Sequence, residues 1–593
     1  MKKVYLGICV SHGASASLMV DGKVIFAYQE ERFNKIKNFV GYPKKSVSKC
    51  LEYVQKNNLI IDEAGFTTVN LPVFPYKYPL DNYFSIEDWI DYYSKNFYSP
   101  NKKISSVIKK IKKIKKIKKI DTYLNYSKFK RKDYFYNYKL FRAEQKKFLL
   151  DQSKGVIKKI SFLDHHTCHA YYAAFAPEIK QKQNIGIITL DSEGDGINQT
   201  FWIFDRKKNI LKKVNQSSEC DIARIYRFIT LILKMKPNEH EFKVMGLAPY
   251  AKHEYSIKVY DEVFKDILKV SNCKIVHNNR PKDLYEYLYK KTKKFRFDNI
   301  AAAVQIMTED LSSKLIKMIS KRYRLSYFSL SGGVSMNIKM NGVLAKLDCV
   351  KKIFVPPTGT DESLSLGACY YLNRKSKNYF LKNIYLGQKL NNFEIDEKFL
   401  RKKINKKFVI QKNINHSEIA KLINNGEIIA VVRGREEFGA RSLGNRSILA
   451  NPYKDGIVQK INDQIKNRDF WMPFALTIME KHHKKFIQNT KSVSSDFMTV
   501  GFDTVKKNYH LIKNGTHQYD QTVRPQILKK DFNEKFYSLI DCFHKLSNVP
   551  ALLNTSLNLH GYPISSKIDD ILFTFNNSGL KYLYIDDNFL IKK

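Results

Sequence analysis

Two histidines one helical turn apart are the sharpest sign of chemistry in this chain of 593 residues. His165 and His169 stand in the sequence HHTCH, and the run AYYAAFA that follows is typical of a helix. Residues four apart lie on one helix face, the spacing at which two imidazoles reach one metal ion. The glutamate of the HExxH zinc-protease motif is absent here. Polar surface histidines at the start of a helix remain the plain alternative.

Two carboxylates follow apolar segments that read as strands. Asp191 ends the strand IGIITL and opens the turn DSEGDG, and Asp361 lies in PPTGTDESLSLGA after KIFV. Two imidazoles with carboxylates suit iron, manganese or zinc, and the sequence does not choose among them. Asp191 could equally hydrogen-bond the backbone of its own turn.

Glycines and arginines suggest a second, anion-binding chemistry. In SLSGGVSMN, Gly332 and Gly333 separate a strand from a helix start, where a phosphate could approach the backbone, although such turns are common. Later, GREEFGARSLGNRSILANP places arginines beside glycines, and guanidinium groups bind phosphate in bidentate fashion. Surface arginines in a basic protein are the alternative. The cations concerned are Arg435, Arg441, Arg446, Lys466, Arg468 and Arg524.

The elements that must position these residues indicate an α/β protein of at least two domains. Residues 1–30 read as strand, turn, strand, turn, strand, and residues 184–214 repeat this plan, which suggests a duplication. Two unrelated hairpins would give the same pattern. A polar, basic stretch over 371–383 is the best linker, and apolar strands such as EIIAVV (427–432) follow it.

Residues 74–150 read as an insertion on the first domain. Their first part is rich in aromatic residues, and residues 101–150 carry 18 Lys or Arg against 3 Asp or Glu. The run from Ile108 to Ile120 has isoleucine at every third position, which drifts around a helix and makes a poor core helix. We expect a solvated basic excursion, whose aromatic half could stack on sugars and whose segment 101–125 could hold an anionic surface.

The composition limits the class of protein. Eight scattered cysteines without C-x-x-C spacing fit a reducing cytoplasm. The sequence contains no run of about 18 apolar residues, so no membrane-spanning helix is predicted. The net charge of +46 would suit a polyanion. Because Lys, Asn, Ile, Tyr and Phe are all abundant, a general bias in residue usage explains the charge better.

Taken together, the motifs resemble the NodU/CmcH family of O-carbamoyltransferases. The resemblance rests on GICVSHGASASLMVDGKVIFAYQEERFNKIK, HHTCHA, EFKVMGLAPY, LSGGVSMN, GREEFGARSLGNRSILANP, KNRDFWMPFA and ALLNTSLN, in family order. It covers residues 4 to about 566 except 74–150. It implies a duplicated actin/hexokinase-like (ASKHA) domain over 1–375 and a YrdC-like α/β domain over 383–593.

The resemblance also implies an activity. The C-terminal domain would use ATP and carbamoyl phosphate to make carbamoyl-adenylate, and the N-terminal domain would pass the carbamoyl group to an alcohol. The implied metal is iron, with manganese or zinc as alternatives, and Mg²⁺ could accompany ATP. The acceptor would be a hydroxyl of a small molecule or glycan.

Individual residues take roles from the same resemblance. His12 would stand near the reacting carbamoyl group as a catalytic residue, together with Lys466 and Arg441. The metal ligands would be His165, His169, Asp191 and Asp361. The nucleotide and carbamoyl phosphate would contact Gly332, Gly333, Asn337, Arg441, Arg446, Lys466, Arg468 and Arg524. Many relatives have arginine just before the PFA of KNRDFWMPFA, where this chain has Met472.

Two other functions compete with this one. The chain could transfer threonylcarbamoyl to tRNA, which its charge would suit, or it could be a non-catalytic sugar- or nucleic-acid-binding protein on the same scaffold. The EERFNKIK and WMPFA signatures favour O-carbamoyl transfer. We therefore expect no specific nucleic-acid partner, a homodimer as one option, and a cytoplasmic protein that could lie on the inner face of the membrane.

Overall fold

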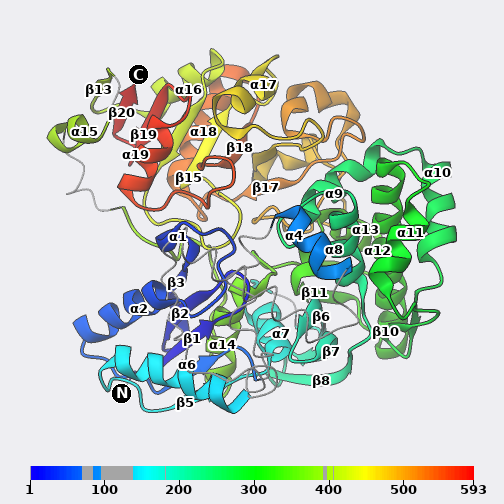
Figure 1. Cartoon of the computed structure of the whole chain (residues 1–593). Helices are drawn as coiled ribbons and strands as arrows, with labels where there is room; N and C mark the ends of the chain where they lie inside the picture. Colours follow the sequence, from blue (N-terminus) through cyan, green and yellow to red (C-terminus); the bar gives the residue numbers. More distant parts are fainter. Residues whose placement is uncertain (1, 70–84, 95–137, 180–181, 391–396, 405–406) are drawn as a thin grey trace. The chain divides into compact units, whose positions relative to one another are not determined.

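The computed structural model describes residues 2–69, 85–94, 138–179, 182–390, 397–404 and 407–593 (Figure 1). Contacts divide the chain into two compact units. Unit 1 comprises Met1–Ile25, Asn38–Met336 and Gly359–Phe380, and unit 2 comprises Phe26–Lys37, Asn337–Thr358 and Leu381–Lys593. The last crossing between units falls within the linker expected over 371–383. Neither 26–37 nor 337–358 was expected to group with the C-terminal part.

The first sheet of unit 1 begins with the three strands expected over residues 1–30. These are β1 (Val4–Cys9), β2 (Ser15–Val20) and β3 (Lys23–Gln29), and the sheet runs β3-β2-β1-β4-β5. Asp21 and Gly22 turn the β2–β3 hairpin with φ of 48° and 74°, as a tight Asp-Gly turn requires. The strands β4 (Glu63–Phe66) and β5 (Ile160–Phe162) join in parallel.

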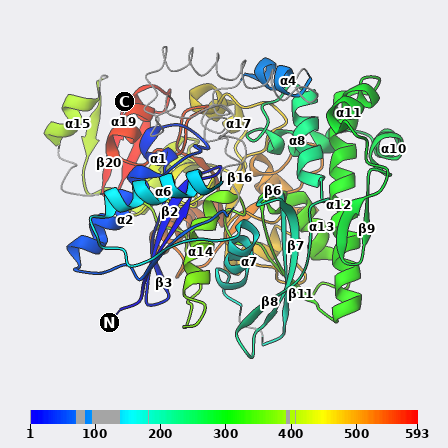
Figure 2. The ribbon, with the colours of Figure 1, turned by 60° about the horizontal axis from the view of Figure 1, so that its bottom comes forward.

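A second sheet repeats the plan expected over residues 184–214. Its strands β6 (Ile185–Gly194), β7 (Ile197–Asp205) and β8 (Ile210–Ser217) are antiparallel neighbours, and β11 (Tyr327–Ser331) pairs with β6 in parallel. Helix α7 (His165–Phe175) packs along β6 and β7 (Figure 2). Both strand–turn–strand predictions are therefore confirmed.

Helices complete unit 1. One group packs around the long helix α12, and α14 packs against α7 and β1. The helices are α2 (Lys44–Lys56), α4 (Ile86–Ser94), α6 (Tyr138–Ser153), α8 (Ile222–Ile232), α9 (Glu241–Leu247), α10 (His253–Val259), α11 (Leu284–Thr292), α12 (Phe297–Tyr323) and α14 (Leu364–Leu372).

One described part of the expected insertion, helix α4, is tied into this helical group. Helix α4 packs against α8 and α11, where Trp89 is only 1% exposed and stacks on Tyr93. The ring of Tyr93 lies 5.0 Å from that of Phe228 and 5.6 Å from that of Tyr285. These two aromatic residues belong to the core, so the expectation that they stack on sugars is wrong. The basic segment 101–125 lies outside the described residues.

Unit 2 is built on one mixed sheet with the strand order β13-β20-β19-β14-β15-β18-β16-β17. Its core is formed by branched and aromatic side chains such as Val432, Leu553 and Phe575. The strands are β13 (Val409–Gln411), β14 (Ile429–Val432), β15 (Arg446–Ala450), β16 (Ala475–Met479), β17 (Pro525–Leu528), β18 (Ala551–Ser556), β19 (Tyr582–Ile585) and β20 (Phe589–Lys592). The helices are α1 (Glu31–Asn34), α13 (Ile338–Lys346), α15 (Glu397–Lys403), α16 (His416–Asn424), α17 (Ile457–Ile461), α18 (Glu534–Ser547) and α19 (Ile568–Asn576).

The N-terminal segment 26–37 joins unit 2 through a buried arginine. Arg32 is 2% exposed and donates hydrogen bonds to the carbonyl groups of Gly439 and Ile564. The Gln29 side chain accepts from Gly439 N at 2.8 Å. A buried guanidinium needs such acceptors, so the EERFNKIK motif is part of the framework of unit 2. Among the described residues, no helix combines the length and apolarity needed to cross a membrane.

Candidate active sites in the two units

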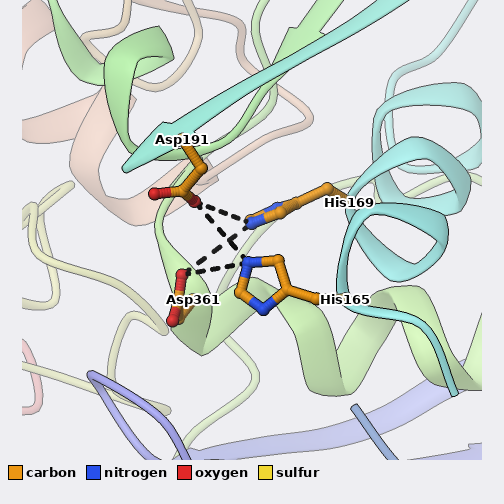
Figure 3. A group of neighbouring side chains, drawn as sticks. All are labelled: His165, His169, Asp191 and Asp361. Carbon is orange, nitrogen blue, oxygen red and sulfur yellow. Dashed lines mark hydrogen bonds and ion pairs between the residues drawn. The ribbon is translucent and has the colours of Figure 1, made fainter. Parts of the chain in front are cut away.

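The four expected metal ligands converge in unit 1 (Figure 3). His165 and His169 lie on one face of α7, Asp191 lies on β6, and Asp361 begins a short 3-10 helix. One ligand atom from each residue lies within 4.8 Å of the other three. The closest histidine–carboxylate pair is His169 Nε2 and Asp191 Oδ2 at 3.2 Å, and His165 Nε2 is 3.7 Å from an oxygen of each carboxylate.

The hydrogen bonds around the histidines leave ligand atoms facing inward. His169 Nδ1 lies 3.0 Å from Ser331 Oγ. If Nδ1 carries the proton and donates it there, the Nε2 lone pair is free for a metal. His165 Nε2 is buried and has no hydrogen-bond partner among the residues that the structure describes. An orphaned imidazole nitrogen opposite two carboxylates fits a transition-metal ion well.

Without a ligand, a protonated His165 offsets part of the negative charge of the two carboxylates. Burial alone would lower the pKa of His165, but Asp361 and Asp191 raise it to about 9. Burial would raise the pKa of Asp191, yet His165 and His169 hold it well below its usual range. A bound cation would take the place of the imidazolium proton.

Glycines permit the close packing of this site. A Cβ on Gly194 would lie 2.2 Å from the His165 ring, and one on Gly332, at φ +91°, would lie 2.2 Å from Leu190 O. Gly333 N donates to Asp191 Oδ2 at 3.3 Å. The double-glycine turn expected to bind nucleotide therefore contacts the metal-site carboxylate.

The nucleotide role of this turn stays a prediction, as do the roles of Asn337 and His12. Asn337 is the N-cap of α13 and accepts from Met340 N at 3.0 Å. His12 is half-buried in the turn that follows β1.

Asp195 organises the site but was not anticipated from the sequence. Its carboxylate accepts from the backbone N–H of His165 at 2.8 Å, from Thr68 Oγ1 at 2.8 Å and from Val69 N at 3.0 Å. Asp195 therefore joins the start of the histidine helix to the chain that leaves for the expected insertion. The acidic residue in the turn DSEGDG was visible, but its three partners are distant in sequence.

Three arginines gather in unit 2 without a carboxylate. Burial lowers the pKa of Arg441 to about 10, and burial together with the charge of Arg441 does the same for Arg468. Burial, Arg441 and Arg468 hold the pKa of Arg524 well below its usual range. None of the three forms an ion pair with a described residue. Clustered, partly buried and unpaired guanidinium groups form a site for an anion.

Lys466 belongs to the same group. It is 3% exposed, and burial, with the charges of Arg468 and Lys37, lowers its pKa well below the usual value. Its Nζ donates to oxygen atoms of Ser556 and Asn558. Lys37 adds its charge near Lys466 from the N-terminal segment.

Two further arginines of the motif hold the framework. Arg446 is fully buried and donates to backbone carbonyl groups, including those of Arg433 at 2.7 Å and Asn445 at 2.9 Å. Arg435 donates to the carbonyl groups of Leu386 and Gly387. The hydrogen bonds of Arg446 occupy the donors that it was expected to offer to phosphate. Its role in binding stays a prediction.

Glu437 shapes the loop that carries Arg441. One carboxylate oxygen accepts from the backbone N–H groups of Leu443 at 2.6 Å, Asn445 at 2.8 Å and Arg446 at 3.4 Å. Sequence reasoning treated this glutamate only as part of a motif. A buried carboxylate that accepts from several N–H groups rigidifies a loop, because breaking those bonds leaves a buried charge unsatisfied.

Comparison with known proteins identifies the family. A model of the carbamoyltransferase N-terminus matches residues 4–370, and a model of the carbamoyltransferase C-terminus matches residues 420–593. The chain belongs to the carbamoyltransferase family, as its motifs predicted.

Its relatives include one uncharacterized protein and two whose names describe a function. An uncharacterized protein of Methanocaldococcus jannaschii is 30% identical over 99% of both chains. Nodulation protein NolNO of Sinorhizobium fredii is 27% identical over 98% of this chain and 79% of its own. The 3'-hydroxymethylcephem-O-carbamoyltransferase of Amycolatopsis lactamdurans is 29% identical over 27% of this chain and 29% of its own.

Proposed function

We propose that this carbamoyltransferase activates carbamoyl phosphate with ATP and transfers the carbamoyl group to a hydroxyl of a small molecule or glycan. The observation that carries the proposal is the pair of complementary sites within one family member. Unit 1 holds a buried His₂Asp₂ group suited to a cation, and unit 2 holds four clustered cations suited to phosphates.

Activation suits the cationic group of unit 2. Water hydrolyses carbamoyl phosphate to carbamate and inorganic phosphate, and a carbamate oxygen then attacks the α-phosphorus of ATP. Pyrophosphate leaves, and carbamoyl-adenylate remains. Arg441, Arg468 and Arg524 would bind the phosphate oxygens and stabilise the charge that grows on them. Mg²⁺ could accompany the ATP. Lys37, whose charge acts on Lys466, adds a cation to a group that has Met472 where the family resemblance leads one to expect an arginine.

Transfer suits the site in unit 1. His165, His169, Asp191 and Asp361 would hold iron, manganese or zinc, which supplies Lewis-acid stabilisation of negative charge when bound. The acceptor oxygen attacks the carbamoyl carbon, AMP leaves, and the hydroxyl proton passes to a base. His12, half-buried after β1, is our candidate for that base, because imidazole titrates in the useful range.

The strand plan supports the proposed architecture. Both sheets of unit 1 start with an antiparallel strand triplet and add a parallel strand next to the first strand of the triplet. This repetition favours the duplicated ASKHA arrangement. Unit 2 would be the YrdC-like domain.

A direct assay tests the function. Purified protein is incubated with ATP and carbamoyl phosphate, and AMP, pyrophosphate and the hydroxylamine-trapped carbamoyl group are measured. We expect all three only when both substrates are present. AMP formation with threonine and bicarbonate instead would support threonylcarbamoyl chemistry, and no AMP under either condition would contradict an adenylating activity.

A further inference from the structure

The Asn554–Asn558 segment at the end of β18 contacts several parts of the cationic group. Asn554 Nδ2 donates to Ser442 O, next to the loop arginine, at 3.3 Å. Thr555 Oγ1 accepts from Arg468 at 3.0 Å. The motif NTSLN, which the proposed chemistry leaves without a role, therefore contacts residues of the anion site.

Asn558 holds Lys466 with its amide in one orientation. Its Nδ2 donates to Leu559 O and Tyr562 O, each at 2.9 Å. Because both acceptors are carbonyl groups, the amide cannot flip without losing two hydrogen bonds. Its Oδ1 consequently faces Lys466 and accepts from Nζ at 2.9 Å.

The other acceptors of Lys466 are also neutral oxygens. Nζ donates to Ser556 O and, at 3.2 Å, to Asn558 O. Lys466 forms no ion pair within the described parts of the chain. Oxygen dipoles stabilise an ammonium group in place, whereas a carboxylate at this distance would also cancel its charge.

We propose that Asn558 is a positioning residue of the anion site. It fixes Lys466 through a neutral oxygen, so that the ammonium charge is not cancelled and attracts a phosphate-bearing ligand electrostatically, although its N–H groups already face protein oxygens. This inference rests on the proposed function. It assigns to the last asparagine of NTSLN a requirement for an amide, where aspartate would have nearly the same shape.

The test compares Asn558→Asp with wild type by calorimetric titration of inorganic pyrophosphate. We expect Asn558→Asp to bind at least about tenfold more weakly, since an ion pair now competes with the ligand. The carboxylate also raises the pKa of Lys466, so the alkaline decline in affinity should move to higher pH. If the variant bound weakly only because its fold was damaged, the pH at which the affinity declines would stay as in the wild type.

A matched control carries the same charge change elsewhere in unit 2. Asn415 is the exposed N-cap of α16 and accepts from Glu418 N at 3.1 Å, a role that aspartate fills equally well. Asn415→Asp should bind pyrophosphate like the wild type. If Asn558→Asp does not fold, Asn558→Ser replaces it, with an expected loss of about threefold or more and an unshifted pH profile.

The outcomes separate this inference from the proposed function. Wild-type affinity in Asn558→Asp, or in Asn558→Ser when that variant is needed, overturns the positioning role. If the wild-type protein forms no AMP and binds no pyrophosphate, the proposed function fails first.

Discussion

The two candidate sites balance their charges in opposite ways. In unit 1, two carboxylates face two imidazoles, and the acidic groups raise the pKa of His165 to about 9. In unit 2, Arg441, Arg468 and Arg524 face one another, and none of them has a carboxylate partner within the described ranges. The first site is negatively charged and attracts a proton or a metal ion, whereas the second is positively charged and attracts an anion.

The residues that position the two sites also differ in charge. Asp195 and Glu437 use carboxylates to gather backbone N–H groups, at positions where their negative charge satisfies donors. Beside Lys466 the structure uses the amide of Asn558 instead. Among these residues, carboxylates build loops or face a cation, whereas a neutral amide contacts the lysine of the anion site.

The sharpest way to break this comparison is to remove a ligand from the unit 1 site. His169→Ala removes the imidazole whose Nε2 lies 3.2 Å from Asp191 and leaves two carboxylates with one partner. Metal affinity should fall by more than the ~10–100-fold typical of losing an outer partner. Elemental analysis should find about one transition metal per chain in wild type, and almost none in the variant.

The neighbouring histidine is the control. His166 is also buried on α7, but its nitrogens face Thr189 Oγ1 at 2.7 Å and Ile197 O at 2.9 Å. His166→Gln should keep its metal. Equal metal content in His169→Ala and wild type would rule out the assigned ligand set.

Removing a positive charge from the unit 2 site should stabilise the ligand-free protein. Arg524 has no hydrogen-bond or ion-pair partner within the described chain, and its neighbours repel it. Arg524→Met should therefore weaken pyrophosphate binding about 100-fold, while the Tm of the ligand-free protein rises by about 2 °C.

The control for this variant is Lys507→Met, which removes one exposed positive charge from unit 2. It should change neither the affinity nor the Tm. If Arg524→Met lowers the Tm, Arg524 stabilises the fold, and the idea that its repulsion by neighbouring arginines destabilises the ligand-free protein is wrong.

Much of this contrast was predictable from the sequence, because it depends on local patterns. The spacing of His165 and His169, the glycine turn after β6 and the repeated strand triplet are short-range signals, and the structure confirms the elements they predicted. The roles of Asp195, Glu437 and Asn558 were not predictable. Their partners are backbone groups or side chains brought close by folding, and no spacing along the chain encodes them.

The pH dependence of metal binding sharpens the description of unit 1. A folded pKa of about 9 for His165, above the ordinary 6.5, means that its protonation stabilises the metal-free protein fully below pH 6.5. That stabilisation is lost as pH rises through about 9, so the Tm of metal-free protein should fall over this range.

Metal must displace the same proton. The affinity for Co²⁺ or Zn²⁺ should therefore rise about tenfold per pH unit from pH 6.5 to about 9 and then level off. Titrations in buffers of different ionisation enthalpy would show the released proton. A flat affinity over this range would contradict a protonated His165 in the metal-free protein.

The smallest expected effect comes from the residue that orients the histidine helix. Asp195→Asn keeps the size of the side chain but replaces one carboxylate oxygen with an NH₂ group, which cannot accept. In the wild type one oxygen accepts from Thr68 Oγ1 and the other from His165 N, each at 2.8 Å, while Val69 N approaches both. With its oxygen turned toward His165 N and Val69 N, the amide can still donate to Thr68 Oγ1, but it lacks the negative charge that strengthens the bonds to both backbone N–H groups.

The start of α7 should then move relative to Asp191 and Asp361, and metal affinity should fall about tenfold, the lower end of the range for an outer partner. Asp205→Asn is the matched control, because Asp205 accepts from Lys207 N and Lys208 N, both at 3.0 Å, in the next turn of the same sheet. It should leave metal affinity unchanged. Asp195→Asn should also leave pyrophosphate binding in unit 2 unchanged, since all its partners lie in unit 1. Equal metal affinities in Asp195→Asn, Asp205→Asn and wild type would mean that the ligands are positioned by α7 and β6 alone.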